Sequence, residues 1–439
     1  MTDLLAQPFR LPCGVTLPNR LCKAAMTEGL ADPWLRATDE LATLYRRWSE
    51  GGAGLLLTGN VMIDRRVLER PGNVAIDRNG GMDQLKRWAK AGTVAGNQLW
   101  MQISHAGRQS PRYVTFHPMG PSDVQLDMLG NYARPRALRE EEILDFVERF
   151  ARVAVTARET GFTGVQIHAA HGYLLSAFLS PVTNRRTDAW GGSIENRARF
   201  LLEAFRATRR AVGPDFPIAI KLNSDDFRKG GFSNEDCLRV VEMLNAESVD
   251  LLEISGGTYE QPKLLGFEGR AETAEPQRAS TRQREAYFLD YAATIRGVAK
   301  MPLMVTGGFR TRAGMEEPLR ENACDVIGLG RPLCTDPDFP KRLLAHDIDE
   351  APRYERTVKL SDRRWLSGAS PILLLKLVNV LGQQGWYYQQ IARLGAGLNA
   401  DRGRGILTAF VAYWIDELTH AWRMRRARSR LDAGELPPA

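Results

Sequence analysis

The sequence predicts an α/β fold, a (β/α)8 TIM barrel followed by a helical C-terminal extension. Short β-rich apolar runs alternate with longer amphipathic stretches from about residue 20 to 345, and no Gly-x-Gly-x-x-Gly motif follows any run. The alternation is typical of a parallel sheet with crossover helices. The missing glycine motif disfavours a doubly wound dinucleotide-binding fold. We therefore expect a barrel over residues 1–350 and a basic, mainly helical extension over residues 351–439.

The elements of the barrel follow one another at fairly even spacing. We expect strands at 21–26, 54–58, 99–103, 164–168, 217–222, 250–254, 302–306 and 325–329. Between and after them we expect helices near 39–50, 82–96, 141–160, 195–212, 234–247, 282–299, 312–322 and 336–345. Eight strands that alternate with eight helices have the count of a (β/α)8 barrel, in which chemistry takes place at the carboxyl ends of the strands.

Charge is distributed unevenly along the chain. The last part, from residue 353 to the end, holds 14 Lys and Arg against 7 Asp and Glu, which accounts for the whole net charge of +7. The barrel region is therefore neutral, which argues against a nucleic-acid-binding main domain. Ordinary proportions of charged and apolar residues indicate a globular protein of the common soluble type.

The five cysteines, Cys13, Cys22, Cys237, Cys324 and Cys334, form no Cys-x-x-Cys pair. Their scatter predicts neither a disulfide framework nor a zinc or iron–sulfur site. Reduced thiols, together with a start that lacks a secretory signal, predict a cytoplasmic protein.

The extension contains two apolar stretches. The first, Ile372 to Leu381, is interrupted by Lys376 and is shorter than the ~20 residues that span a bilayer, so we expect no transmembrane segment. The second runs from Ile406 to Trp422 at helical spacing and ends in a cluster of arginines. Such a helix packs on the barrel or on a partner subunit, or it contacts a membrane surface or an acidic partner.

The main candidate for chemistry is the run His168-Ala169-Ala170-His171-Gly172-Tyr173, because it begins at the carboxyl end of the fourth predicted strand and continues into the loop beyond. Two histidines could share a metal ion, but no acidic or cysteine ligand stands in a motif beside them. A general-base or nucleophile system would need an adjacent elbow serine, which Ser176 and Ser180 do not provide. A third interpretation is a pair of N–H donors for an electron-rich oxygen, with Tyr173 as proton source. A fourth interpretation is that the two histidines have no chemical role.

Glycines gather after the last two predicted strands. Gly307 and Gly308 follow the seventh, and Gly330 precedes Arg331 after the eighth. Barrels commonly bind a phosphate at these two loops, where glycine lets backbone N–H groups approach the oxygens. The same glycines could instead simply end the strands.

The motifs, taken together, resemble the old yellow enzyme family of FMN-dependent ene-reductases. The resemblance rests on the run from His168 to Arg199 and on the segments around Thr27, Gln102 and Arg331, in family order. It implies an FMN flavoenzyme that takes hydride from NADPH or NADH and passes it to the β-carbon of an α,β-unsaturated carbonyl. In this scheme His168 and His171 bind the carbonyl oxygen of the substrate, and Tyr173 protonates the α-carbon.

The resemblance also assigns residues to the cofactor. Gln102 corresponds to the amide at the flavin pyrimidine edge, Thr27 to the group that bonds flavin O4, and Lys221 to the cation beside flavin N1 and O2, where many relatives carry Arg. Ala24, Ala25 and Met26 correspond to the first-strand segment under the ring, and Gly59 to the small residue of the second strand. Gly307, Gly308, Gly330 and Arg331 correspond to the phosphate site.

Some expectations depart from the family pattern or stay open. Gly29 lies close to where some relatives place a substrate-contacting Tyr, so the pocket floor is either opened or filled from elsewhere. The extension matches no standard family ending. An NAD(P)H oxidase, or an oxidative amine or ring-desaturating enzyme, is the alternative on the same barrel. A second alternative is a barrel that retains flavin and whose basic tail interacts with a partner or a membrane. The expected partners are a small activated alkene and a second copy of the chain in a homodimer.

Overall fold

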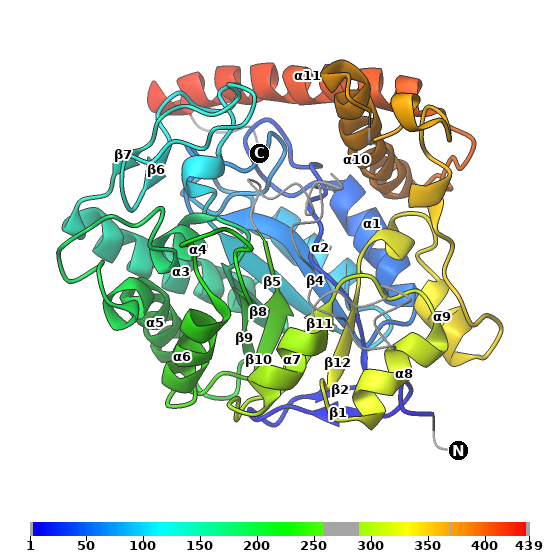
Figure 1. Cartoon of the computed structure of the whole chain (residues 1–439), viewed down its shortest axis with the longest axis horizontal. Helices are drawn as coiled ribbons and strands as arrows, with labels where there is room; N and C mark the ends of the chain where they lie inside the picture. The colour runs from blue at the N-terminus through cyan, green and yellow to red at the C-terminus, as the bar shows by residue number, and fades with distance from the viewer. Residues whose placement is uncertain (1–2, 258–288, 369, 436–439) are drawn as a thin grey trace.

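A closed barrel of eight parallel strands forms the centre of the molecule (Figure 1). The structure is a computed structural model that describes residues 3–257, 289–368 and 370–435. In barrel order the strands are β3 (Leu21–Lys23), β4 (Leu55–Met62), β5 (Gln98–Ser104), β8 (Gly164–Ala169), β9 (Ile218–Asn223), β10 (Leu251–Ser255), β11 (Leu303–Thr306) and β12 (Val326–Leu329). β12 pairs with β3 and closes the ring, which confirms the predicted fold class.

Helices cover the outside of the barrel, so the strands are buried on both faces. They are α1 (Asp39–Glu50), α2 (Met82–Ala91), α3 (Glu140–Glu159), α5 (Ile194–Val212), α6 (Asn234–Leu244), α7 (Leu289–Arg296), α8 (Arg312–Arg320) and α9 (Phe339–Leu344). Thr38, Ser193 and Ser233 accept backbone N–H bonds at the starts of α1, α5 and α6. These caps fix where the helices begin.

The amino-terminal end of the barrel is plugged. A small hairpin of β1 (Phe9–Arg10) and β2 (Thr16–Leu17) brings Leu11 and Leu17 into an apolar cluster with Trp100 and Met304. Because this end is filled with side chains, the carboxyl end is left for polar groups and ligands.

The structure differs from the sequence prediction in element lengths. The first predicted strand, 21–26, ends at Lys23, although the Ala24 N–H still donates to Leu329 O at 2.9 Å. The second runs past its predicted end to Met62, with an irregular register after Leu57. Short elements that were not predicted include the β1–β2 hairpin, the pair of β6 (Met119–Gly120) and β7 (Arg136–Ala137), and α4 (Leu174–Leu179). Part of the predicted helix 282–299 and of the irregular segment after β10 lies outside the described residues.

The extension forms two long helices, α10 (Leu373–Gly395) and α11 (Ile406–Asp432), as its helical prediction required. A Cβ at Gly382 would lie 2.7 Å from Ile406 Cγ1, and one at Gly385 would lie 2.6 Å from Tyr413 Cβ. The two glycines thus let α10 and α11 cross closely. None of the helices in the described ranges is long and apolar enough to cross a membrane.

The helix α11 lies on the carboxyl-end side of the barrel, along the top of the view in Figure 1. Arg425 donates to the carbonyl of Arg112 at 3.0 Å, and Arg428 donates to the carbonyl of Arg66 at 3.3 Å. Both carbonyls belong to loops that follow barrel strands, β5 and β4. The extension therefore covers the side of the barrel where the predicted site lies.

Candidate active site

The end of β8 holds two imidazoles and a phenol in one cluster. The ring centroid of His168 lies 5.1 Å from that of His171 and 4.8 Å from that of Tyr173. His171 adopts a φ of +63°, a left-handed conformation that is uncommon outside glycine. Its backbone N–H donates to Oδ1 of Asn223 at 3.0 Å, which holds the turn in place. The structure thus brings together the three residues of the predicted catalytic motif.

His168 has a defined tautomer. The backbone N–H of Ala170 donates to its Nδ1 at 3.2 Å, so the proton of the neutral ring lies on Nε2. Burial lowers the pKa of His168 well below its ordinary value, and His171 and Lys221 lower it further. His168 is therefore a neutral side chain that can donate a hydrogen bond from Nε2.

The side chain of His171 is held by a neighbouring strand. Its Nε2 lies 2.6 Å from Oγ of Ser255, the last residue of β10. Burial, followed by the charge of Lys221, lowers its pKa well below the ordinary value. Ser255 and Asn223 orient His171, and neither was predicted from the sequence, although both stand at or next to the end of a predicted strand.

A buried chain of hydrogen bonds joins four adjacent strands deeper in the barrel. Gln102 Nε2 donates to Gln166 Oε1 at 2.7 Å, and Gln166 Nε2 donates to Glu253 Oε2 at 2.8 Å. The ammonium of Lys221 forms an ion pair with Glu253 at 2.8 Å. The network thus connects Gln102 and Lys221, the two residues predicted at the flavin pyrimidine ring. Sequence reasoning missed Glu253, although a charged residue inside the apolar run 250–254 was a visible signal.

Thr27 bonds to a buried carboxylate. Its Oγ1 donates to Glu69 Oε2 at 2.8 Å, and the side-chain amides of Asn60 and Asn73 donate to the same oxygen at 3.3 Å. Burial raises the pKa of Glu69 above its ordinary value, although Arg70 and these bonds act in the opposite direction. Within the described residues, Thr27 forms no hydrogen bond to another predicted site residue. Its hydroxyl proton points to Glu69.

The other predicted cofactor residues line one side of the barrel mouth. A Cβ added at Gly330 would lie 3.8 Å from Sδ of Met26, so these two predicted residues are neighbours. Ala24 is buried, and Ala25 and Met26 are half-buried. A Cβ at Gly59 would overlap the carboxylate of Glu28 and would lie 2.5 Å from Met26 O. In this structure Gly59 is therefore needed for the close approach of the first-strand segment.

The predicted phosphate loops contain two arginines. Gly307 and Gly308 have φ of +132° and +85°, which glycine adopts without strain. Arg310 Nη2 donates to Glu355 Oε1 at 2.7 Å, and Arg331 Nη1 lies 3.9 Å from the same oxygen. Burial acts to raise the pKa of Glu355, but the charges of Arg331 and Arg310 outweigh it and hold the pKa below its ordinary value. The two arginines at this corner of the barrel mouth therefore already bind an anionic group, the carboxylate of Glu355.

Arg70 fills the space at Gly29. A Cβ at Gly29 would lie 3.0 Å from Cζ of Arg70, and that guanidinium carbon lies 3.8 Å from the ring centroid of Tyr388 in α10. Arg70 also pairs with Glu417 of α11, with Nε donating to Oε1 at 2.9 Å. The pocket floor next to Gly29 is thus filled by other segments, namely by Arg70 of the loop after β4 and by Tyr388 of the extension.

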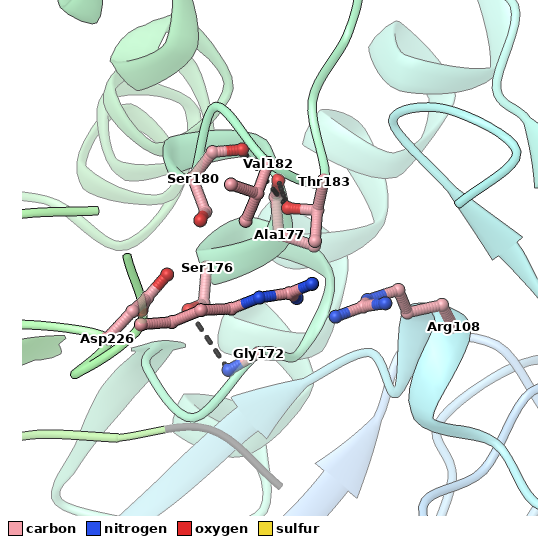
Figure 2. Close-up of a pocket in the computed structure, with 9 residues that line it drawn as sticks. Arg108, Gly172, Ser176, Ala177, Ser180, Val182, Thr183 and Asp226 are labelled. Atoms are coloured by element: carbon pink, nitrogen blue, oxygen red, sulfur yellow. Dashed lines mark hydrogen bonds between the residues drawn. The ribbon is translucent and has the colours of Figure 1, made fainter. Parts of the chain in front are cut away.

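A small pocket borders the predicted catalytic motif at Gly172 (Figure 2). In the view, Arg108, from the turn after β5, and Asp226, from the loop after β9, lie on opposite sides, with the α4 segment above them. Its lining residues are Arg108, Gly172, Ser176, Ala177, Ser180, Val182, Thr183, Asp226 and Arg228. Gly172 connects the pocket to the motif, while none of the predicted flavin contacts lines it. Its position does not support a nucleophile role for Ser176, whose Oγ accepts the Gly172 N–H at 3.0 Å.

The residues present suit FMN. An amide and an ammonium lie within the barrel, where a flavin pyrimidine ring needs donors and acceptors, and an arginine pair at the mouth already holds a carboxylate. No cluster of three or more His, Cys, Asp or Glu residues that could hold a metal ion occurs in the part of the chain that the structure describes.

Comparisons with known proteins identify the family of this chain. The model of the NADH:flavin oxidoreductase / NADH oxidase family matches residues 5–350. The chain is 36% identical over 375 residues to an NADH-dependent flavin oxidoreductase, iliE, of Hypocrea jecorina, covering 80% of this chain and 92% of that protein. It is 34% identical over 335 residues to an NADH oxidase of Thermoanaerobacter brockii, covering 75% of this chain and 49% of that longer protein.

One solved structure shares the fold of this chain. The old yellow enzyme homologue of Zymomonas mobilis superimposes with a TM-score of 0.67 at 25% identity, covering 84% of this chain and 99% of that one. The match includes the barrel and leaves little of the neighbour unaligned. The chain therefore belongs to the NADH:flavin oxidoreductase / NADH oxidase family, the old yellow enzyme family, and is an FMN-dependent oxidoreductase that uses a nicotinamide as donor.

Proposed function

We propose that this enzyme is an ene-reductase, which reduces a C=C bond conjugated to a carbonyl group with electrons from NADH or NADPH. The observation that carries the proposal is the arrangement of His168, His171 and Tyr173 in one cluster, with the donor proton of His168 on Nε2. Reduction of an activated alkene requires a hydrogen-bond donor for the carbonyl oxygen and a proton donor for the α-carbon, and the cluster offers both.

FMN, when bound and reduced, supplies the hydride that adds to the β-carbon. Residues that would hold it are Gln102, Lys221 and Thr27 at the ring, Ala24, Ala25, Met26 and Gly59 beside it, and Gly307, Gly308, Gly330 and Arg331 at the phosphate. The ammonium of Lys221 would stabilise negative charge on the bound ring less directionally than an arginine, because it lacks the planar pair of donors.

The histidines stabilise the charge that develops on the substrate oxygen. A preorganised donor in such a position contributes about 3–4 kcal/mol to catalysis. His168 is neutral and donates from Nε2, so it stabilises the oxygen without transferring its proton. A neutral imidazole donates from one ring nitrogen only. The Nε2 of His171 lies 2.6 Å from Ser255 Oγ, so His171 would donate to the substrate oxygen from Nε2 only by giving up this contact.

Tyr173 completes the reaction by protonating the α-carbon. Its O–H bond breaks as the new C–H bond forms, and the phenolate then recovers a proton from solvent. A phenol has an ordinary pKa near 10, but the electron-rich carbon is a stronger base, so the transfer is favourable.

The proposal is tested by rapid-mixing kinetics of the FMN-loaded protein. Reduction by NADH and reoxidation by cyclohexenone are followed separately through the flavin absorbance. We expect Tyr173→Phe to slow reoxidation by the enone and to leave reduction unchanged. Equal loss in both half-reactions would remove Tyr173 from this role, and no reoxidation by any enone would overturn the proposal.

The NADH oxidase of Thermoanaerobacter brockii favours one alternative, an oxidase on the same barrel. Steady turnover with oxygen alone, without acceleration by an enone, would support it. An oxidative amine or ring-desaturating activity would instead appear as flavin reduction by the amine or the saturated ring.

We further propose that residues 351–439 are an integral part of the fold on the barrel of residues 1–350. Support comes from Trp386 of α10, which is fully buried, and from the pairing of Arg70 with Glu417. A tail that served only a partner or a membrane would not need these contacts.

A further inference from the structure

The outward face of α11 is apolar over much of its length. The inward face packs on the rest of the protein through Ile406, Ala409, Tyr413, Glu417, Ala421, Met424 and Ala427, all buried. The opposite face carries Leu407, Val411, Ile415, Leu418 and Trp422, each more than half exposed. Steps of four, four, three and four residues keep these five side chains in one narrow line along the helix. We name them the α11 stripe.

The stripe belongs to a wider concentration of exposed apolar side chains. Ten of the sixteen large apolar side chains that are exposed in the described residues lie between residues 351 and 435. A scattered exposed leucine needs no explanation, but a continuous apolar line on an outer surface marks a binding face. The extension has therefore kept an apolar surface free while burying another against the barrel.

The positive charges that follow the α11 stripe indicate which kind of partner binds to it. Beyond Trp422 the helix continues with Arg423, Arg425, Arg426, Arg428 and Arg430. The guanidinium of Arg426 lies 4.8 Å from the ring centroid of Trp422, so the cationic part begins where the stripe ends. These five arginines are part of the basic extension, residues 353–439, which carries the surplus of positive charge of the chain.

A second copy of the chain fits this face poorly. Parallel packing of two α11 helices would bring the two arginine clusters together. Antiparallel packing would place each cluster opposite the start of the other helix, where Arg402 and Arg404 lie, each paired with an aspartate, so the repulsion is strongest in the parallel arrangement. Like charges facing each other across an interface are unfavourable. Anionic lipid headgroups would instead neutralise the arginines, while the acyl region accepts the stripe.

We propose that α11 is a membrane-surface helix, which lies on an anionic lipid surface with the α11 stripe inserted and with Arg423 and Arg426 at the headgroups. A tryptophan at the boundary between the apolar and cationic parts suits the water–lipid interface. Because the inward face of α11 contacts the loops after β4 and β5, docking would bring the carboxyl-end side of the barrel close to the lipid. The proposal concerns binding alone and does not depend on which reaction the enzyme catalyses.

The test is co-sedimentation of the full-length, FMN-loaded protein with vesicles. Phosphatidylglycerol-containing vesicles are compared with pure phosphatidylcholine vesicles, at low and at raised salt. We expect binding to the anionic vesicles that weakens with salt, and about a tenfold or greater loss for Ile415→Glu combined with Leu418→Glu. Arg423→Glu with Arg426→Glu should remove the preference for anionic lipid.

The matched control is Leu144→Glu, an exposed apolar position on α3, which should bind as the unchanged protein does. Flavin content and thermal unfolding show that each variant is folded. Absence of vesicle binding by the unchanged protein would overturn the proposal. So would a dimer in solution that Ile415→Glu converts to monomer without any vesicle binding, since the stripe would then be an interface between two copies.

Discussion

Arg70 and Glu417 form a buried ion pair that joins the loop after β4 to the last helix of the chain, 347 residues further on. The carboxylate of Glu417 also accepts a hydrogen bond from the Tyr113 hydroxyl at 3.1 Å. Arg70 lies between Gly29 on one side and Tyr388 on the other. Glu69, the residue before Arg70, accepts a hydrogen bond from Thr27, the predicted flavin contact. One set of contacts thus joins the extension, the pocket floor at Gly29 and Thr27.

Breaking this pair should destabilise the protein strongly. Glu417→Ala leaves the buried guanidinium without its carboxylate, and we expect the free energy of unfolding to fall by about 3–5 kcal/mol. Urea unfolding measures the change. Asp83→Ala, which removes the exposed partner of Lys86, should cost less than about 1 kcal/mol. A similar small loss for Glu417→Ala would show that water replaces the carboxylate easily.

Removal of the whole extension should abolish folding. A chain that ends at residue 350 exposes the surface of α1 that α10 covers and leaves Arg70 without Glu417. We expect insoluble protein or protein that does not retain FMN, as judged by gel filtration and flavin absorbance. If the shortened chain stays yellow, folded and fully active, the extension serves association alone.

The Lys221–Glu253 pair should influence the flavin. Glu253→Gln removes a buried negative charge but keeps an oxygen for Gln166, so the ammonium of Lys221 is less neutralised. Under the proposed cofactor contacts, reduced anionic flavin is then favoured, and the midpoint potential rises by about 30 mV for each 1.4 kcal/mol of added preference. Spectroelectrochemical titration measures the potential. Glu203→Gln on the exposed side of α5 is the control and should leave the potential unchanged.

Three histidines with lowered pKa should make stability depend on pH. Burial lowers the pKa of His105 to about 4, and it lowers those of His168 and His171 well below 6.5. Between these values and 6.5 the unfolded chain binds protons that the folded chain does not, so stability falls as pH falls. Each histidine contributes about 1.4 kcal/mol per pH unit in that window.

The comparison that isolates one group is His105→Gln. Buried carboxyl groups with raised pKa, such as Glu69 and Asp226, act in the opposite direction, so the difference between the two proteins is the informative quantity. Urea unfolding at several pH values between about 4.5 and 6.5 should give a shallower slope for the variant by about 1.4 kcal/mol per pH unit. Identical slopes would mean that His105 titrates normally in the fold.

Gly59 should tolerate no side chain. An alanine methyl group would meet the carboxylate of Glu28 and the carbonyl of Met26, so Gly59→Ala should cost about 1–3 kcal/mol and reduce FMN retention. Unfolding and flavin content measure both effects. Gly403→Ala, where the nearest atom is 3.7 Å away, is the matched control. Retained stability and flavin in Gly59→Ala would show that the first-strand segment moves aside.

The sequence by itself determined the barrel, because apolar periodicity is a local property that each strand and helix carries in its own residues. It also placed His168, His171 and Tyr173 at a strand end, and its glycines and Arg331 in the last two loops. The ends of β3 and β4 were wrong by a few residues, because pairing with neighbouring strands sets where a ladder stops.

Only the tertiary structure decided how distant residues meet. The space at Gly29 is filled by Arg70 and Tyr388, Glu355 of the extension lies on Arg310 and Arg331, and Ser255 orients His171. Each contact joins residues from separate segments, and no local pattern encodes which two will approach. The buried charges of Glu253 and Glu417 are explained by the partners that the closed barrel and the packed extension provide, since a charge is buried stably only when it is paired.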